Sequence, residues 1–337
     1  MRGCSFAATV FFALLGCGDD LAKTRPDAAT DAVVSAPSDA SRPPAPDGGP
    51  ATPSPCGDAD PQPCPPQGYA TWPMPNPQSL PLPNPGSFTV TPLTATDRIT
   101  GLQWQRAHTE KRTWQHALDT CAALSLEGYD DWRLPSRIEL VSSIDDTRQP
   151  TTDHAAFAAT AVDYFWASSI VSFDTTLAYS VYFGAGLTAY GRRSEPTAHV
   201  RCVRGGSPGV VPRYTISANE VTDRNTRLVW QRQVASEPLS FATANILCDE
   251  STQGGHADWR LPTLKEIQTI VEERFATPMI DPAVFPDTPS GRYWTSSAAN
   301  QGATNAVYFD AGDGQTEHAA FDEPLFVRCV RNVPQGR

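Results

Sequence analysis

Basic residues and long apolar runs are both scarce in this chain of 337 residues. Lysine and arginine number 26 against 37 aspartates and glutamates, so the formal net charge at pH 7 is −11. Nucleic-acid binding needs basic patches, and the excess of acid argues against that class of protein. No run reaches about 20 apolar residues, the length that a membrane-spanning helix requires. We therefore expect neither a nucleic-acid-binding protein nor a mature transmembrane helix.

The first 17 residues have the pattern of an export signal. Arg2 supplies a positive charge, and residues 6–15 form an apolar stretch too short to span a bilayer. The letters Leu-Leu-Gly-Cys that end at Cys17 resemble a bacterial lipobox, which is cleaved before a cysteine that receives lipid. We predict a lipoprotein signal at 1–17 and lipid on Cys17, which anchors the exported protein in the bacterial cell envelope. Gly18 favours the outer membrane or cell surface; an ordinary secretory signal with an incidental cysteine is the alternative.

Residues 18–86 are rich in proline. Of the 32 prolines in the chain, 18 lie between positions 21 and 90, and alanine, serine, aspartate and glycine make up much of the remainder. Such a composition cannot bury enough apolar surface to offset the loss of chain entropy. We predict that residues 18–86 are a disordered tether in which Cys56 and Cys64 close a small disulfide loop. A metal or redox site at these two cysteines would lack a neighbouring histidine and a Cys-x-x-Cys spacing.

The remainder of the chain contains one pattern twice. Thr-Asp-Arg-x-Thr-x-Leu-x-Trp-Gln-Arg begins at Thr96 and again at Thr222. Four further motifs follow in the same order, at offsets of 126 to 128 residues: Asp-Trp-Arg-Leu-Pro from Asp131 and Asp258, Trp-x-Ser-Ser from Trp166 and Trp294, Val-Tyr-Phe from Val181 and Val307, and Val-Arg-Cys-Val-Arg from Val200 and Val327. Such steady offsets indicate tandem copies, which we place at 87–206 and 212–334.

Each copy is predicted to contain a strand, two helices and then several strands. A first helix is expected to begin at Thr113 in one copy and at Ser240 in the other. A capping box, in which a Ser or Thr cap and a Glu three residues later exchange hydrogen bonds, marks the second helix. The two boxes are Ser136 with Glu139 and Thr263 with Glu266. This order predicts an α+β domain with a mostly antiparallel sheet in each copy.

Each copy also has two cysteines, one in its first predicted helix and one in its last predicted strand. Export brings a protein into oxidising conditions in which such pairs form disulfides. A duplicated unit favours pairing within each copy, so we predict the disulfides Cys121–Cys202 and Cys248–Cys329. Pairing across the copies is the alternative.

These motifs resemble the family named after the C-terminal domain of the Legionella collagen-like adhesin, long known as a domain of unknown function. The resemblance rests on the Thr-Asp opening, the Asp-Trp-Arg-Leu-Pro loop, the Trp-x-Ser-Ser strand and the closing Val-Arg-Cys-Val-Arg, and covers residues 87–206 and 212–334. It implies a C-type-lectin-like fold, in which a disulfide also ties the first helix to the last strand. The named member binds sulfated host polysaccharides, which implies glycan recognition at a cell surface rather than catalysis.

The charge of the two copies departs from that of a binder of sulfated chains. Residues 96–204 carry 11 Lys and Arg against 13 Asp and Glu, and residues 222–331 carry 9 against 15, giving net charges of −2 and −6. An acidic surface repels a polyanion. We expect a glycan ligand and a non-enzymatic adhesion role; the alternative is a structural or protein–protein module of the envelope without sugar affinity.

Comparing the two copies with each other tests for a shared reactive site. None of the six histidines recurs, which argues against a shared metal ligand or general base. The repeated serines lie in apolar strands without a Gly-x-Ser-x-Gly elbow, and we interpret them as core hydroxyls that bond the backbone. They are Ser168, Ser169, Ser296 and Ser297.

Charged residues and tryptophans do recur. An acid–base pair is one reading of the charges, but we interpret them as caps and Arg–carboxylate bridges that lock loops to the sheet. We interpret the tryptophans as core residues rather than glycan-stacking platforms. The charged pairs are Asp97/Asp223, Asp131/Asp258, Glu139/Glu266, Arg106/Arg232, Arg133/Arg260, Arg201/Arg328 and Arg204/Arg331. The tryptophans are Trp104, Trp132, Trp166, Trp230, Trp259 and Trp294.

One acidic turn is the candidate calcium site. Asp310 and Asp313 place carboxylates at close spacing, and the matching residues 184–188 of the first copy have none. The Glu-Pro-Asn and Trp-Asn-Asp calcium motifs of lectins are absent from the sequence. We expect at most one weak calcium site, at Asp310 and Asp313, and no cofactor.

The stretch from Arg260 to Glu266 also resembles the Arg-Leu-Pro-Thr-x-x-Glu segment of formylglycine-generating enzymes, which share the lectin-like architecture. Those enzymes need reactive cysteines, whereas the predicted disulfides account for the cysteines of each copy. We therefore expect no enzymatic activity.

Overall fold

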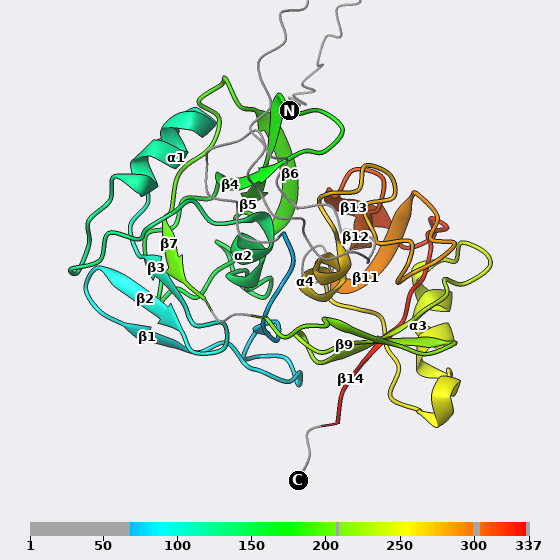
Figure 1. Cartoon of the computed structure of the whole chain (residues 1–337). Helices are drawn as coiled ribbons and strands as arrows, with labels where there is room; N and C mark the ends of the chain where they lie inside the picture. The colour runs from blue at the N-terminus through cyan, green and yellow to red at the C-terminus, as the bar shows by residue number, and fades with distance from the viewer. Residues whose placement is uncertain (1–67, 207–208, 299–303, 335–337) are drawn as a thin grey trace, which may run out of the picture. The chain divides into compact units, whose positions relative to one another are not determined.

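Figure 1 shows the computed structural model of the chain, which describes residues 68–206, 209–298 and 304–334. All of these residues belong to one compact unit, Ser54–Arg337. The predicted signal at 1–17, the lipid site at Cys17 and the Cys56–Cys64 loop lie outside the described residues. Within the described ranges, no helix is both long enough and apolar enough to cross a membrane.

The first copy consists of two antiparallel sheets and two helices. One sheet has the strand order β1-β2-β3-β7 and the other β4-β5-β6. The helices are α1 (Trp114–Ala122) and α2 (Arg137–Ser142). The strands are β1 (Phe88–Val90), β2 (Thr94–Asp97), β3 (Leu102–Gln105), β4 (Tyr164–Ile170), β5 (Leu177–Tyr182), β6 (Leu187–Arg192) and β7 (Val203–Gly205).

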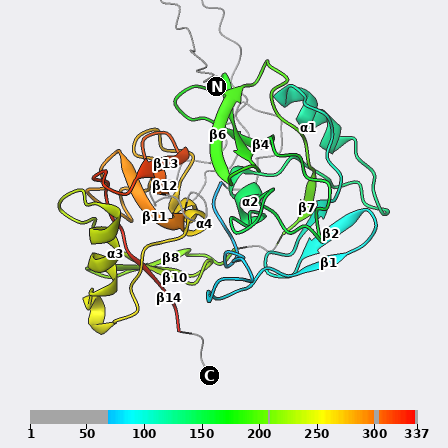
Figure 2. The same cartoon turned by 180° about the vertical axis from the view of Figure 1, so that it is seen from behind.

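The second copy repeats this order, with sheets β8-β9-β10-β14 and β11-β12-β13 (Figure 2). Its helices are α3 (Phe241–Asp249), α4 (Leu264–Ile267) and the short turns η1 (Gln253–Gly255) and η2 (Gln268–Ile270). Its strands are β8 (Tyr214–Ile216), β9 (Glu220–Asp223), β10 (Leu228–Gln231), β11 (Arg292–Ala298), β12 (Asn305–Asp310), β13 (Thr316–Ala320) and β14 (Val330–Asn332). The predicted α+β class, with two tandem and mostly antiparallel domains, is confirmed.

The strand register corrects one detail of the repeat. The sequence comparison equates the Val-Tyr-Phe runs that begin at 181 and 307, an offset of 126. In the structure Trp166 pairs with Ser180, whereas the equivalent Trp294 pairs with Tyr308. Ser180 therefore takes the place of Tyr308, and β5 and β6 correspond to β12 and β13 at an offset of 128. The sequence pattern does not reveal a shift of two residues, because residues two positions apart lie on the same face of a strand and the alternation of buried and exposed positions is unchanged.

Both predicted capping boxes are present. The Ser136 hydroxyl accepts a hydrogen bond from the Glu139 N–H, and the Glu139 carboxylate accepts one from the Ser136 N–H. Thr263 and Glu266 make the same exchange before α4. Every residue of α2 and α4 is buried, so both short helices are enclosed by protein rather than lying on a surface.

The predicted disulfides Cys121–Cys202 and Cys248–Cys329 are both present. Each spans 81 positions of the sequence, and closing a loop of that length contributes about 4–5 kcal/mol in the chain-entropy model. The six repeated tryptophans are at most 2% exposed, which confirms that they are core residues.

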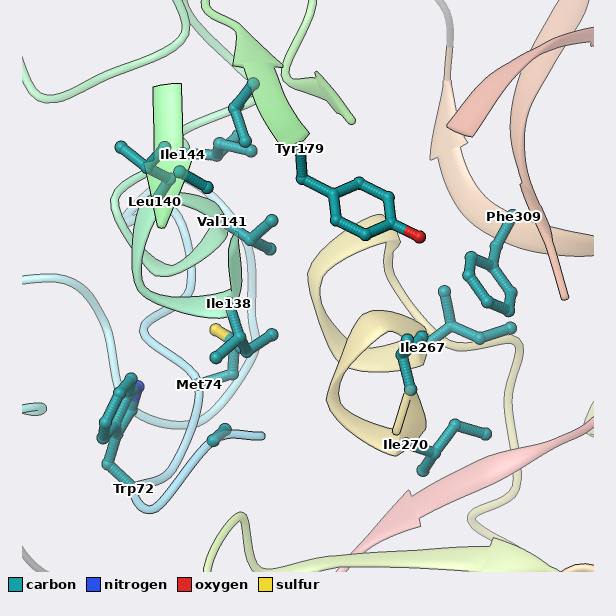
Figure 3. Close-up of a cluster of buried hydrophobic side chains, with 14 of the residues drawn as sticks. Trp72, Met74, Ile138, Leu140, Val141, Ile144, Tyr179, Ile267, Ile270 and Phe309 are labelled. Carbon is teal, nitrogen blue, oxygen red and sulfur yellow. The ribbon is translucent and has the colours of Figure 1, made fainter. Parts of the chain in front are cut away.

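Residues 68–86 are folded, and the predicted end of the tether is wrong for this segment. Ala70, Trp72 and Met74 are buried in a hydrophobic cluster that also contains residues of both copies. Figure 3 shows Trp72 and Met74 beside Ile138 of α2. Composition alone fails here because these three apolar residues alternate with others, so an extended chain directs them to one side. We call residues 68–86 the arm.

Candidate functional site

The arginine of the Asp-Trp-Arg-Leu-Pro loop forms a fork with a glutamate in both copies. The two Nη atoms of Arg133 each donate to a different carboxylate oxygen of Glu139 at 2.6 Å. Arg260 makes the same fork with Glu266 at 2.7 Å. Burial opposes ionisation of Glu266, but Arg260 and the capping bonds of Thr263 keep the pKa of Glu266 below its ordinary value. The paired charges therefore fix the loop to the helix start.

Other recurring charges also bond to the protein itself. Arg204 donates to Asp131 through two nitrogens, and Arg331 lies 3.6 Å from Asp258. Two aspartates accept backbone N–H groups in turns; they are Asp97 and Asp223. The prediction of caps and Arg–carboxylate bridges is confirmed for these residues.

Arg201 and Arg328 do not fit that prediction, because no carboxylate within the described ranges pairs with either. Arg201 donates to the Thr160 hydroxyl at 2.9 Å, and its guanidinium lies 4.6 Å from the centre of the Phe157 ring. Burial lowers the pKa of Arg201 to about 9. Arg328 likewise donates to two backbone carbonyls and lies 4.7 Å from the Phe285 ring. Carbonyl oxygens and aromatic rings, rather than carboxylates, stabilise these two guanidinium groups.

Two cations join the copies through α2 and α4. Arg137 of α2 donates from Nε to Glu273 at 3.0 Å and from Nη1 to Gln268 at 2.8 Å, both in the second copy. In the opposite direction, Lys265 of α4 donates to two backbone carbonyls at the end of α2, at 2.9 and 2.7 Å. Arg137 and Lys265 are both buried.

Comparison of the copies with each other missed these two cations. At the offset of 127, Arg137 corresponds to Leu264 and Lys265 corresponds to Ile138, so neither cation recurs. In the sequence, the one indication of Arg137 and Lys265 was that each predicted second helix carries a charged residue next to its apolar stripe. An interface between two unlike surfaces is built from residues that differ, and a search for repeated residues passes over it.

The predicted role of core hydroxyls is confirmed for Ser169 and Ser297, whereas Ser296 is exposed. Ser169 accepts the N–H of Arg137, and Ser297 accepts the N–H of Leu264. Ser297 also donates to Asp146 of the first copy at 2.7 Å. Ser296 donates to the carbonyl before the capping box of α4.

Lys265 gives the stability of the protein a dependence on pH. Burial lowers the pKa of Lys265 from 10.5 to about 8, against the opposing attraction of Asp146 and Asp97. Between these pKa values the unfolded chain binds a proton that the folded protein does not, so the free energy of unfolding rises with pH in this range. We expect wild type to gain stability relative to Lys265→Met between pH 8 and pH 10.5 in urea unfolding. A constant difference between the two proteins across that range would contradict the assignment.

The carboxylates of the acidic turn, Asp310 and Asp313, accept hydrogen bonds from residues of the same turn. Asp310 accepts the Gly312 N–H at 2.7 Å, and Asp313 accepts the backbone and side-chain N–H groups of Gln315 at 3.0 and 2.7 Å. The corrected offset makes residues 182–186 the counterpart in the first copy, which also lacks a carboxylate. Among the residues that the structure describes, no three His, Cys, Asp or Glu side chains are grouped to hold a metal ion. A weak calcium site at this turn stays a prediction.

One stacked pair of histidines belongs to the first copy alone. The rings of His108 and His199 lie 4.9 Å apart between centroids, and His199 Nδ1 is 2.7 Å from the Thr109 carbonyl oxygen. Burial and the neighbouring Arg201 lower the pKa of His108 to about 4, so its ring is neutral at physiological pH. The second copy has Val and Phe at these two places, which makes the pair a local packing feature.

A comparison with protein families matches the chain twice. The model of the Lcl C-terminal domain covers residues 93–204 and 219–331. The chain belongs to the Lcl C-terminal domain family. Both matches fall within the ranges that the repeated motifs predict, and each includes the disulfide and the capping box of its copy. A comparison with curated proteins found no match. Membership of the Lcl C-terminal domain family indicates a surface-associated, adhesin-like module.

Proposed function

We propose that this tandem Lcl C-terminal domain protein is a non-enzymatic adhesin that binds a neutral glycan at the cell envelope. The observation that carries the proposal is the use of the shared charged motifs within the fold, above all the Arg133–Glu139 and Arg260–Glu266 forks. Because both copies use these motifs to fix a loop and a helix, ligand recognition belongs to surfaces on which the copies differ. Such surfaces lie outside the repeated motifs.

Charge favours a neutral glycan over a sulfated one. The copies carry net charges of −2 and −6 over residues 96–204 and 222–331, and a negative field lowers the local concentration of a polyanion. A neutral sugar is recognised through stacking on aromatic rings and through hydrogen bonds. A negatively charged protein surface does not weaken either of these interactions. The lectin-like architecture that the family resemblance implies agrees with this ligand class.

The proposal includes attachment to the envelope through lipid on Cys17. The lipobox letters that end at Cys17 support export and acylation. The proline-rich residues 18–67 then connect the lipid to the arm and hold the two copies away from the bilayer. Two copies that both bind would raise avidity by making the second contact intramolecular.

A protein partner is the second candidate, and one surface favours it. Ile246 and Leu247 of α3 are 55% and 41% exposed. Asp119 and Thr120 occupy the equivalent positions of α1 at the offset of 127. The second copy therefore presents an apolar helix face where the first copy presents a polar one, as a protein-binding module would.

A glycan array distinguishes the two candidates. The chain beginning at residue 18, which keeps the arm, is applied with and without EDTA. We expect binding to one or more neutral glycans that persists in EDTA. Loss of the signal in EDTA would instead indicate calcium-dependent binding at Asp310 and Asp313. A blank array, together with one envelope protein captured by wild type but not by Ile246→Asp, would favour the second candidate.

A further inference from the structure

A row of three apolar side chains crosses one end of the three-stranded sheet of the first copy. Tyr164 of β4 lies opposite Tyr182 of β5, and Tyr182 lies opposite Leu187 of β6. Directly opposed residues project from the same face of a sheet. The two tyrosine rings lie 4.9 Å apart between centroids, with 36° between their planes. Tyr164 is 39% exposed, and the other two side chains are partly exposed. We call these residues the tyrosine row.

Helix α1 covers the neighbouring part of this face and leaves the tyrosine row open. Trp166 and Ala178, which lie further along the same face of β4 and β5, pack with Trp114 and Ala117 of α1 in a buried cluster. No member of the tyrosine row belongs to a core cluster of the described residues. The row is therefore a surface feature and not the edge of the core.

The second copy shows that the fold does not need an apolar row here. At the offset of 128, the three positions of the tyrosine row are occupied by Arg292, Asp310 and Gln315. Arg292 pairs with Asp310 across the sheet, and the Asp310 N–H donates to the Gln315 carbonyl. The same three-stranded sheet thus forms with polar side chains at all three places. Folding alone does not account for two exposed aromatic rings in the first copy.

The Tyr182 ring is held in place by its own turn. A Cβ atom on Gly184 would overlap the Tyr182 ring, so the ring lies directly across this glycine. Neither tyrosine hydroxyl hydrogen-bonds to another residue that the structure describes. The surface therefore consists of one fixed ring, that of Tyr182, packed beside the more exposed ring of Tyr164, with free hydroxyl groups at their edges. A rigid tyrosine provides contact area at low entropic cost.

We propose that the tyrosine row is a stacking platform for one pyranose ring of a neutral glycan. The proposal rests on the glycan-binding function proposed above and assigns it to the first copy. A pyranose has an apolar C–H face that packs on aromatic rings and hydroxyls around its rim that bond the free phenols. Asp163, which precedes Tyr164 in the chain, pairs with Lys111 at 2.8 Å. Lys111 is therefore already paired with a carboxylate and is not free to attract a sulfate group.

Native gel electrophoresis in gels that contain a neutral polysaccharide tests the platform. The gels contain dextran, xyloglucan, galactomannan or hydroxyethylcellulose, and the net charge of −11 moves the protein through them. The Tyr164→Arg/Tyr182→Asp variant copies the second copy's own pair, so it is compatible with the sheet and leaves the net charge unchanged. We expect wild type to be retarded by at least one polysaccharide. We expect the variant to bind it about tenfold more weakly, which corresponds to the loss of stacking on two rings.

Two further variants separate stacking from other effects. Tyr164→Phe/Tyr182→Phe keeps both rings and should keep most of the retardation. Tyr129→Ala removes an exposed tyrosine of the same copy that lies 3.6 Å from the Arg204 guanidinium, and it should bind as wild type does.

Each outcome decides one question. Equal retardation of wild type and folded Tyr164→Arg/Tyr182→Asp, with near-ultraviolet circular dichroism as the folding check, overturns the platform but leaves glycan binding intact. Equal weakening by Tyr129→Ala overturns it as well. A positive glycan array without retardation by any of the four polysaccharides also rejects the platform, whereas a blank array removes the proposed function itself.

Discussion

Replacing Trp72 by alanine is expected to lower the free energy of unfolding by about 3–5 kcal/mol, the usual effect of removing a buried tryptophan. Trp72 is 5% exposed and belongs to the cluster that includes residues of both copies. Its indole Nε1 has no hydrogen-bond partner among the described residues. The loss therefore comes from packing alone, and Trp72→Phe should lose much less. Urea unfolding, followed by the fluorescence of the remaining tryptophans, measures both variants.

A second position in the arm provides the matched control. Gln78 is exposed, and we expect Gln78→Ala to change the free energy of unfolding by about 0.5 kcal/mol or less. Unfolding of Trp72→Ala at the same urea concentration as wild type would show that the arm lies outside the cooperative unit. The repeated motifs alone suggest that the domains begin at residue 87. A chain that begins there lacks Trp72, and we expect its free energy of unfolding to be lowered as in Trp72→Ala.

Features with a local physical cause were predictable from the sequence. Each capping box is specified by two residues three positions apart, and each disulfide by the only two cysteines of its copy. The burial of four of the tryptophans follows from their place in predicted strands: Trp104, Trp166, Trp230 and Trp294. The duplication strengthened every one of these predictions, because a feature that occurs twice at one offset has a structural reason in both places.

Features that depend on contact between distant segments were not predictable in this way. The arm packs only because two copies meet beside it, and its proline content gave no indication of that surface. Arg137 and Lys265 were missed because each occurs in one copy alone. The tyrosine row was hidden by the offset of 126, which equated Tyr182 with Tyr308; the strand register gives Tyr182 the place of Asp310 instead. The candidate site became visible only when the three-dimensional register replaced the sequence match.

Replacing Arg137 by alanine is expected to lower the free energy of unfolding by about 3–5 kcal/mol, as for other buried ion pairs that lose one partner. The Arg137 side chain is 0% exposed and that of Glu273 is 14% exposed. Burial raises the pKa of Glu273 although Arg137 opposes that shift. Without the guanidinium, the carboxylate of Glu273 and the amide of Gln268 would remain buried with fewer partners. Urea unfolding at pH 7 measures the loss.

A surface arginine and a double variant show whether the effect comes from the buried pair. Arg148 is 36% exposed in its side chain and pairs with Asp145 at 2.8 Å, so Arg148→Ala should cost less than about 1 kcal/mol. Arg137→Leu/Glu273→Leu removes both charges and should recover much of the loss. Leucine suits the first of these places, because Leu264 begins α4 at the equivalent position. If Arg137→Ala costs no more than Arg148→Ala, the buried guanidinium of Arg137 contributes nothing to the contact between the two copies.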